Sequence, residues 1–487
     1  MIHADQDSRM PKAEASVSRR LNIGVFIDHD IIVRHFIRSG AFKSLMEKHR
    51  VLFAFPPDGY KNNGRVSVDV HGLGLGHRVR RVAVNDARLR IWSHLTHIDR
   101  LRWRPGSHWA CIRKIVREAI GPGHVRDFTL RSLPIAYQWY RRASLRRLAA
   151  LPNTHIDEFI RSEGIDIIIH PTVLYGPYID DLAMASQDWR VPMIVMMNSW
   201  DNPCTKRIVS RPADWLLVWG RQSKTYAEDI YGMPTDRAIV FGAAQFEAYR
   251  KPPTLTRADF CKIHGLDPTR KLIVYAGSNI HADEFSHLVS LDNAIVDGSV
   301  PGVSIVYRPH PWGGLPPDTC ARILAYPWKE VRLQNKTRSW LEDWVAGRSD
   351  IVYPDYQDSQ DLLSNVDGLI SPYSTMIIEA AMKGLAVATY MPVDDQGTYL
   401  DQLAPLTHFK EVLASPHFIH ARGRDQLIPA ARQLVDRMND AGFPERMREA
   451  SRFYVERFDQ PYGERLTAFV ESAVRGSPGG EREREVA

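Results

Sequence analysis

Short apolar runs rich in Val and Ile alternate with longer segments of helical periodicity along most of the chain. This alternation is typical of parallel β-sheets covered by helices on both faces. The first series of expected strands comprises residues 21–27, 51–55, 165–169, 191–197 and 215–219. The second series comprises residues 272–276, 304–307, 351–353, 368–370 and 386–390. The pattern predicts an α/β protein with two Rossmann-like, doubly wound domains that face a cleft.

Changes in composition suggest where the domains begin and end. The polar, proline-containing stretch 250–256 is expected to link an N-terminal domain (21–249) to a C-terminal domain (257–424). Residues 425–475 show helical periodicity with little strand character, and residues 1–20 and 476–487 are expected to be disordered tails.

Composition narrows the class of protein. The chain has 487 residues, of which 44% are hydrophobic and 25% charged, which excludes a largely disordered chain. No apolar run approaches the roughly 18 residues of a membrane-spanning helix, and the N-terminus lacks the apolar core of a secretory signal. The four cysteines show no CxxC spacing. We therefore expect a cytoplasmic protein, with peripheral binding to the inner face of the membrane left open.

Positive charge is concentrated in one segment. Between His77 and Ala150 there are 17 Lys or Arg and four acids, a local balance of +13, so the rest of the chain carries −7 of the net +6. This basic insertion (71–150) is suited to an anionic membrane surface or a diphosphate-linked acceptor, or forms ordinary solvated helices. No zinc-finger spacing or RNA-binding strand accompanies the charge, so we expect no nucleic-acid partner.

The stretch from Ile370 to Tyr390 is suited to binding an anion. A buried strand is expected to end near Pro372, and Ser374 or Thr375 is expected to cap the helix that follows. Free backbone N–H groups and hydroxyls at such a helix start attract phosphate. Glu379, about one turn further on, is placed to accept two ribose hydroxyls. The alternative is a plain capped helix with a surface Glu.

A second anion-suited turn follows an earlier strand of the same domain. Arg308 can clamp phosphate bidentately, and His310, held between two prolines, can donate to a diphosphate oxygen. The alternative for His310 is a histidine satisfied locally at a strand end. Gly277 and Ser278 are the third segment expected to contact the phosphates, because the backbone can approach a ligand closely at a glycine.

These motifs together resemble a known group of enzymes. The Arg308-Pro-His-Pro turn, the Ser-Thr turn with Glu379 four residues beyond Thr375, and Gly384 are similar to nucleotide-sugar-dependent glycosyltransferases of the GT-B fold. The likeness is greatest to the bacterial surface-polysaccharide group with CDP-glycerol glycerophosphotransferases, Kdo transferases and polysialyltransferases. It implies that His310 and Ser374-Thr375 hold the donor's phosphates, that 257–424 is the donor domain, and that 21–249 receives a glycan or polyprenyl-linked acceptor.

The resemblance extends upstream with two departures. Trp200-Asp201-Asn202 with Lys206 stands where the glycerophosphotransferases have a Trp-His-Gly turn with a following Lys. Asp201 thus replaces that family's catalytic His, and Gln245 replaces an Arg. These departures favour sugar transfer over transfer of glycerol phosphate.

An inverting transfer needs a base near the acceptor hydroxyl, opposite the leaving phosphate. Asp201 is the first candidate and the Asp28-His29 pair the second; the alternative for Asp201 is an Asx-type turn. The acceptor is expected to contact five residues, namely Asn198, Trp200, Asn202, Lys206 and His170. We expect no metal and no cofactor beyond the nucleotide-activated sugar as co-substrate.

Three alternatives stay open at this point. A CDP-glycerol-type phosphotransferase would use the same scaffold, and a non-hydrolysing UDP-sugar 2-epimerase would turn over a nucleotide sugar without an acceptor. A non-enzymatic scaffold for envelope assembly would not depend on Asp201 or His310.

Overall fold

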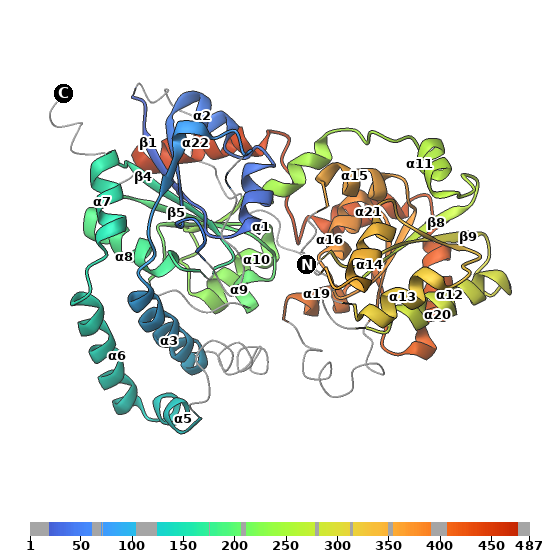
Figure 1. Cartoon of the computed structure of the whole chain (residues 1–487), viewed down its shortest axis with the longest axis horizontal. Coiled ribbons are helices and arrows are strands. Elements are labelled where there is room, and N and C mark those ends of the chain that lie inside the picture. The colour runs from blue at the N-terminus through green and yellow to red at the C-terminus, as the bar shows by residue number, and fades with distance from the viewer. Residues whose placement is uncertain are drawn as a thin grey trace, which may run out of the picture.

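The apolar runs of the sequence form two parallel sheets, each covered by its own helices (Figure 1). This computed structural model describes residues 19–60, 70, 72–103, 124–174, 176–205, 211–277, 282–311, 315–348, 354–390 and 407–475. The predicted α/β class with two Rossmann-like doubly wound sheets is confirmed. Outside the described residues lie the expected C-terminal tail, the expected strand at 351–353, Lys206 and Ser278. The expected N-terminal tail also lies outside them, except for residues 19 and 20.

The N-terminal sheet has the strand order β3-β2-β1-β4-β5-β6-β7, with all strands parallel. Its central strands are buried on both faces, which explains their continuous apolar sequences. The strands are β1 (Asn22–Phe26), β2 (Arg50–Phe55), β3 (Val79–Arg81), β4 (Ile167–Thr172), β5 (Met193–Met197), β6 (Trp215–Val218) and β7 (Ala238–Val240).

The connections of this domain are mainly helical. Beside the sheet lie α1 (Asp30–Ile32), the π-helical turn η1 (Val33–Ile37), α2 (Lys43–Lys48), η2 (Gly76–Arg78), α7 (Thr154–Glu163), α8 (Ile179–Trp189), α9 (Asn202–Thr205), α10 (Arg221–Tyr226), η3 (Ala227–Tyr231) and η4 (Ala244–Arg250). The last of these leads toward the second domain (Figure 1).

The C-terminal sheet has the strand order β10-β9-β8-β11-β12-β13, again with all strands parallel. In both sheets the first three strands in sequence are added toward one edge, and the later strands are added from the first strand toward the other edge. Its strands are β8 (Lys271–Ala276), β9 (Val303–Arg308), β10 (Val331–Leu333), β11 (Gly368–Pro372), β12 (Ala386–Tyr390) and β13 (Phe418–Ala421). Its helices are α11 (Arg257–His264), α12 (Glu284–Val296), α13 (Pro317–Ala325), α14 (Thr337–Val345), α15 (Tyr356–Ser364), α16 (Met376–Lys383), η5 (Thr407–Phe409), α19 (Lys410–Ala414), α20 (Arg424–Met438) and α21 (Phe443–Ser451).

The last helix returns to the N-terminal domain. In Figure 1 α22 (Tyr462–Arg475) lies beside α2 and β1, although it follows the whole C-terminal domain in sequence. Leu466 and Val470 are buried in the same core cluster as Ile23 and Phe53. Buried Arg465 donates a 3.0 Å hydrogen bond to the carbonyl of Phe241. This segment therefore ties the two domains together, which helical periodicity alone did not reveal.

Most of the basic insertion forms a helical arm between β3 and β4. The arm consists of α3 (Asp86–Trp103), α5 (His124–Ser132) and α6 (Pro134–Ala149), and it projects away from the C-terminal domain (Figure 1). Arg88 and the indole of Trp92 both bind the buried carboxylate of Asp181 on α8, at 2.7–2.8 Å. Arg88 also donates to the carbonyl of Leu148, so one arginine fastens α3 and α6 to the domain.

None of the described helices has the length and hydropathy needed to span a bilayer.

Candidate active site where the two sheets face each other

The strongest site candidates follow strands of both sheets. In open parallel sheets, ligands bind outside the carboxyl ends of the strands, at the point where the strand order reverses. In the N-terminal sheet that point lies between β1 and β4, next to Asp28 and His170. In the C-terminal sheet it lies between β8 and β11, next to Gly277 and Ser374. Several of the predicted residues therefore occupy the two topological switch points.

Arg308, the last residue of β9, is a buried cation of the C-terminal domain. Its side chain is held by Ser359 on α15, whose hydroxyl oxygen lies 3.2 Å from both terminal guanidinium nitrogens. The residue is only 6% exposed, and this burial lowers the pKa of the guanidinium, opposed mainly by the nearby carboxylate of Glu379. Ser359 accepts one N–H from each of these two nitrogens, so the other N–H donors of the guanidinium can bind a ligand.

Glu379 lies in the first turn of α16, where a carboxylate also interacts well with the helix dipole. It accepts a hydrogen bond from the hydroxyl of Tyr249 on η4. Burial raises the pKa of the carboxyl, against the lowering influence of Tyr249, Arg34 and Arg308. A nucleotide ribose at this carboxylate remains a prediction, and Tyr249 is a partner that the sequence did not indicate.

The start of α16 differs in one respect from the expectation. The hydroxyl of Ser374 accepts the N–H of Met376 at 3.3 Å, and Thr375 occupies the N-cap position without a side-chain cap. The N–H groups of Ile377 and Ile378 bond to the carbonyls of Ser374 and Thr375. These amides are therefore not free, because the first turn closes on itself. Any anion here is expected to rely on the hydroxyls and on Arg308.

His310 lies two residues beyond β9 and is partly buried. Burial, together with the adjacent positive charge of Arg308, lowers its pKa to about 4. The ring is therefore neutral near pH 7 and is suited to donate a hydrogen bond rather than to supply charge. Its predicted contact with a diphosphate remains a prediction.

Gly277 is needed for a reason other than ligand approach. A Cβ at this position would lie 2.5 Å from a carboxylate oxygen of Glu284. That buried carboxylate accepts a 2.6 Å hydrogen bond from the hydroxyl of Tyr307 on β9. The missing side chain thus makes room for Glu284, and the predicted contact of Gly277 with phosphate stays a prediction.

Asp28 and His170 form a buried pair at the switch point of the N-terminal sheet. Nδ1 of His170 lies 2.9 Å from the carbonyl of Phe26, and its Nε2 lies 3.9 Å from Oδ2 of Asp28. Burial raises the pKa of Asp28 to about 8 and lowers that of His170 to about 4. Gly176 packs against the carboxylate so closely that a Cβ there would collide with Oδ2. The pair therefore consists of a neutral imidazole next to a carboxyl group whose pKa is about 8.

His170 has no exposed surface and lies next to the carboxyl group of Asp28. Its predicted contact with an acceptor remains a prediction that this burial does not support. His29 caps α1, and its Nδ1 accepts the N–H of Ile31 at 3.0 Å. That hydrogen bond places the ring proton on Nε2 in the neutral tautomer, which makes His29 a donor in this arrangement.

The turn after β5 is held by its asparagines. Oδ1 of Asn198 lies 2.7 Å from Nδ1 of His35 on η1, and Oδ1 of Asn202 accepts the N–H of Ser199 at 2.8 Å. Nδ2 of Asn202 lies 3.4 Å from a carboxylate oxygen of Asp201. Asp201 thus lies on an Asx-stabilised turn and is partly exposed. Its catalytic role and the acceptor contacts of the two asparagines remain predictions.

Trp200 is 1% exposed and packs edge-on against three rings of the C-terminal half, those of His408, Phe409 and Tyr454. This arrangement makes it part of the domain interface. A contact with an acceptor remains a prediction that its burial does not support.

Arg34 is the main residue that sequence reasoning missed. It lies on the π-helical turn η1, a kind of element that is frequent at functional sites. Its guanidinium donates to the carbonyl of Pro354 at 2.9 Å and lies 4.3 Å from the centre of the Tyr356 ring, both in the C-terminal domain. Its charge also contributes to lowering the pKa of Arg308. Nothing in the local sequence distinguishes Arg34 from a surface arginine.

Within the described part of the chain, no three His, Cys, Asp or Glu side chains come together as metal ligands would. The prediction that the reaction needs no metal stays a prediction.

Comparison with known proteins supports the fold. The chain is similar to a putative UDP-N-acetylglucosamine 2-epimerase from Listeria monocytogenes, with a TM-score of 0.50 and 11% identity, covering 93% of this chain and 96% of that one. It is also similar to a glycosyltransferase from Rickettsia africae (TM-score 0.47, 11% identity, 94% and 99% covered) and to the wall teichoic acid polymerase TagF (0.39, 12%, 93% and 88%). No protein-family model and no curated protein matches the sequence. The two parallel sheets and the likeness to the Listeria structure confirm the predicted GT-B-like architecture at the level of the fold.

Proposed function

We propose that the protein is a glycosyltransferase that moves a sugar from a nucleotide-activated donor to a polysaccharide or lipid-linked glycan. The observation that carries this proposal is the convergence of Arg308 and Glu379 of one domain with Arg34 of the other. Two guanidinium groups held within electrostatic reach of each other favour an anion between them. A diphosphate with an attached ribose matches two cations and one hydroxyl-binding carboxylate.

In this proposal the C-terminal domain holds the donor. Arg308 binds the diphosphate, with Ser374, Thr375 and His310 as additional donors, and Glu379 accepts the ribose hydroxyls. Arg34 neutralises the charge that grows on the leaving diphosphate as the glycosidic C–O bond to phosphate breaks. Because Arg34 comes from the other domain, this stabilisation depends on the domains being in contact.

We assign the base to Asp28 in preference to Asp201. A base is most effective when its pKa lies near the working pH, and burial places Asp28 there. Asp28 would accept the proton of the acceptor hydroxyl while that oxygen attacks the anomeric carbon opposite the diphosphate, which inverts the configuration. Asp28 is 3% exposed, so this role requires the segment around Gly176 to move away. Asp201 is the second choice, because it is more accessible.

A 2-epimerase is the second candidate function, because the Listeria protein with the same architecture is named as one. An epimerase also binds a nucleotide sugar but needs no acceptor. The helical arm has no obvious use in such an enzyme, which favours a transferase.

The proposal is tested in two stages. Thermal shift with CMP, CDP, UDP, GDP and dTDP identifies the nucleotide, since a ligand at 100 times its Kd stabilises the fold by about 2.7 kcal/mol. The matching nucleotide sugar is then incubated with and without membrane lipid extract, and products are analysed by mass spectrometry. Transfer only with the extract supports a transferase, and conversion of the sugar nucleotide alone supports an epimerase. Absence of stabilisation by every nucleotide contradicts both.

A further inference from the structure

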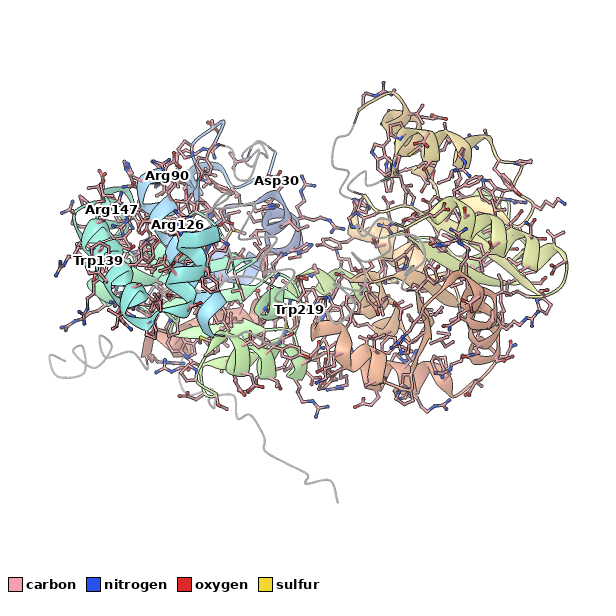
Figure 2. The ribbon with its side chains drawn as sticks, turned by 90° about the horizontal axis from the view of Figure 1, so that it is seen from below. Asp30, Arg90, Arg126, Trp139, Arg147 and Trp219 are labelled. Atoms are coloured by element: carbon pink, nitrogen blue, oxygen red, sulfur yellow. The ribbon has the colours of Figure 1, made fainter. Side chains whose placement is uncertain are left out.

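The outer surface of the helical arm is unusually apolar. Four of the eight large apolar side chains that are exposed among the described residues lie on α5, on α6 or between them. They are Phe128 (62% exposed), Leu133 (55%), Ile135 (86%) and Trp139 (75%). Figure 1 shows α5 at the end of the arm furthest from both sheets, and Figure 2 shows Trp139 on the same arm. Such a cluster on a projecting element marks an interaction surface.

Arginines around these side chains greatly outnumber acids. Residues 126–150 contain six arginines and one acid, Asp127. Arg141, Arg142, Arg146 and Arg147 on α6 are all exposed, as is Arg126 on α5. Among the described residues, Arg141, Arg142, Arg146 and Arg147 form no ion pair. Figure 2 shows Arg126, Arg147 and Arg90 on the same arm as Trp139.

The helical periodicity of α6 brings the two kinds of side chain onto one face. At about 100° per residue, Ile135, Trp139 and Arg146 fall within a stripe of roughly 60°, together with Arg142. With a rise of about 1.5 Å per residue, the stripe is about 16 Å long from Ile135 to Arg146. Its apolar half lies toward the tip of the arm and its basic half toward the domain.

The opposite face of α6 is used for packing. Tyr137 donates to the carboxylate of Asp99 on α3, and Leu148 packs with Trp92 and Leu95. The exposed stripe is therefore not needed to hold the arm together, and substitutions in it are expected to leave the fold intact.

We propose that this stripe docks on an anionic lipid bilayer, with Trp139, Ile135 and the tip in the interfacial region and the arginines on lipid phosphates. Apolar side chains that enter the interface and adjacent cations that bind anionic headgroups together give stable peripheral attachment. Indole side chains are well suited to the interface because they combine an apolar ring with a polar N–H.

Charge argues against a second copy of this chain as the partner, and the exposed apolar side chains argue against a nucleic acid. A second copy of this chain would bring the same arginines face to face in a symmetric dimer, with too few acids to compensate them. A nucleic acid would be bound by arginines and stacked aromatics, which leaves the 86% exposed side chain of Ile135 and that of Leu133 without a role.

The experiment is flotation of the full chain with vesicles, without nucleotide or acceptor, so that its outcome does not depend on the proposed activity. Vesicles of phosphatidylcholine alone are compared with vesicles containing about 30% phosphatidylglycerol, at low and high salt. The variants are the apolar pair Ile135→Ser/Trp139→Ser and the charge pair Arg142→Glu/Arg146→Glu. Matched controls are Ile263→Ser and Arg338→Glu, which alter exposed residues of the C-terminal domain.

The wild type is expected to bind the anionic vesicles at low salt and to dissociate at high salt. Each variant pair is expected to lower the partition coefficient at least about tenfold, and each control less than about twofold. Unchanged melting temperatures of the variants confirm that they fold. No binding of the wild type to anionic vesicles, or equal binding by the arm variants, overturns the proposal. A dimer in analytical ultracentrifugation that the apolar pair abolishes would assign the stripe to self-association instead.

Discussion

The two domains share one strand order but use it differently. In the C-terminal domain the guanidinium of Arg308, the hydroxyls of Ser374 and Thr375 and the carboxylate of Glu379 follow the strands around the switch point. In the N-terminal domain the corresponding point holds the buried Asp28–His170 pair, and the connection after β3 expands into the helical arm. The comparison teaches that one topology provides the location of a site, whereas the segments after each strand decide which side chains stand there.

The largest effect on turnover is expected when the proposed proton acceptor of the N-terminal domain is removed. Asp28→Asn should lower turnover about 10²- to 10⁴-fold, because general base catalysis contributes this much, while nucleotide affinity stays within about twofold. Steady-state rates and calorimetric titration measure the two quantities separately. Asp201→Asn is the matched control and should retain most activity; the reverse result would transfer the role to Asp201.

Arg308→Ala should weaken nucleoside diphosphate binding about 10- to 100-fold, because it removes a charge-assisted contact worth about 1.5–3 kcal/mol. Arg308→Lys should recover only part of the affinity, since an ammonium lacks the planar fork. Arg332→Ala on the neighbouring strand β10 serves as control. Equal affinity of Arg308→Ala and wild type in calorimetry would remove the diphosphate from this position.

Arg34→Ala tests whether the two domains act together. We expect kcat to fall about tenfold with a smaller change in nucleotide affinity, because Arg34 acts on the leaving group from the other domain. Arg38→Ala, an exposed position just beyond the same helical turn, is the control. A loss of affinity equal to that of Arg308→Ala, with kcat unchanged, would show that Arg34 only binds the ground state.

The smallest expected effect concerns stability. Burial raises the pKa of Asp28 in the folded state to about 8, so the group favours folding while protonated and this contribution is lost as pH rises from about 4 to about 8. Asp28→Asn lacks this loss. The melting temperature of Asp28→Asn minus that of the wild type should therefore become about 1–3 °C more positive when the pH is raised from 5 to 8.5. A constant difference across that range would mean that Asp28 is ionised throughout.

Local pattern was enough to find the central strands, because strands buried on both faces must be apolar throughout. The strands at the sheet edges were not predicted: β3, β7 and β10 have three residues each and are largely half-exposed, so they show neither a long apolar run nor clear alternation. The strand β13 lies at the end of the expected C-terminal domain, in a stretch for which no element was predicted.

The candidate site was predicted in part. Arg308, His310 and Ser374 were predicted because each closely follows an expected strand, where the topology rule applies, and Glu379 because it lies one turn into the helix after such a strand. Arg34 and Tyr249 were missed, because their importance comes from contacts with residues more than 100 positions away. Gly277 was predicted as a place of close backbone approach, and the structure shows the Glu284 side chain in the space its missing Cβ leaves.

The sequence by itself determined the class of fold, the two-part division of the strands and the concentration of positive charge in one insertion, because these depend on composition and on patterns within a few residues. Only the tertiary structure decided that α22 returns to the first domain, that Asp28 is enclosed with His170, and that the arm turns its arginines and Trp139 outward. Burial and electrostatic environment are set by neighbours distant in sequence, and these quantities control both pKa values and the choice of partner.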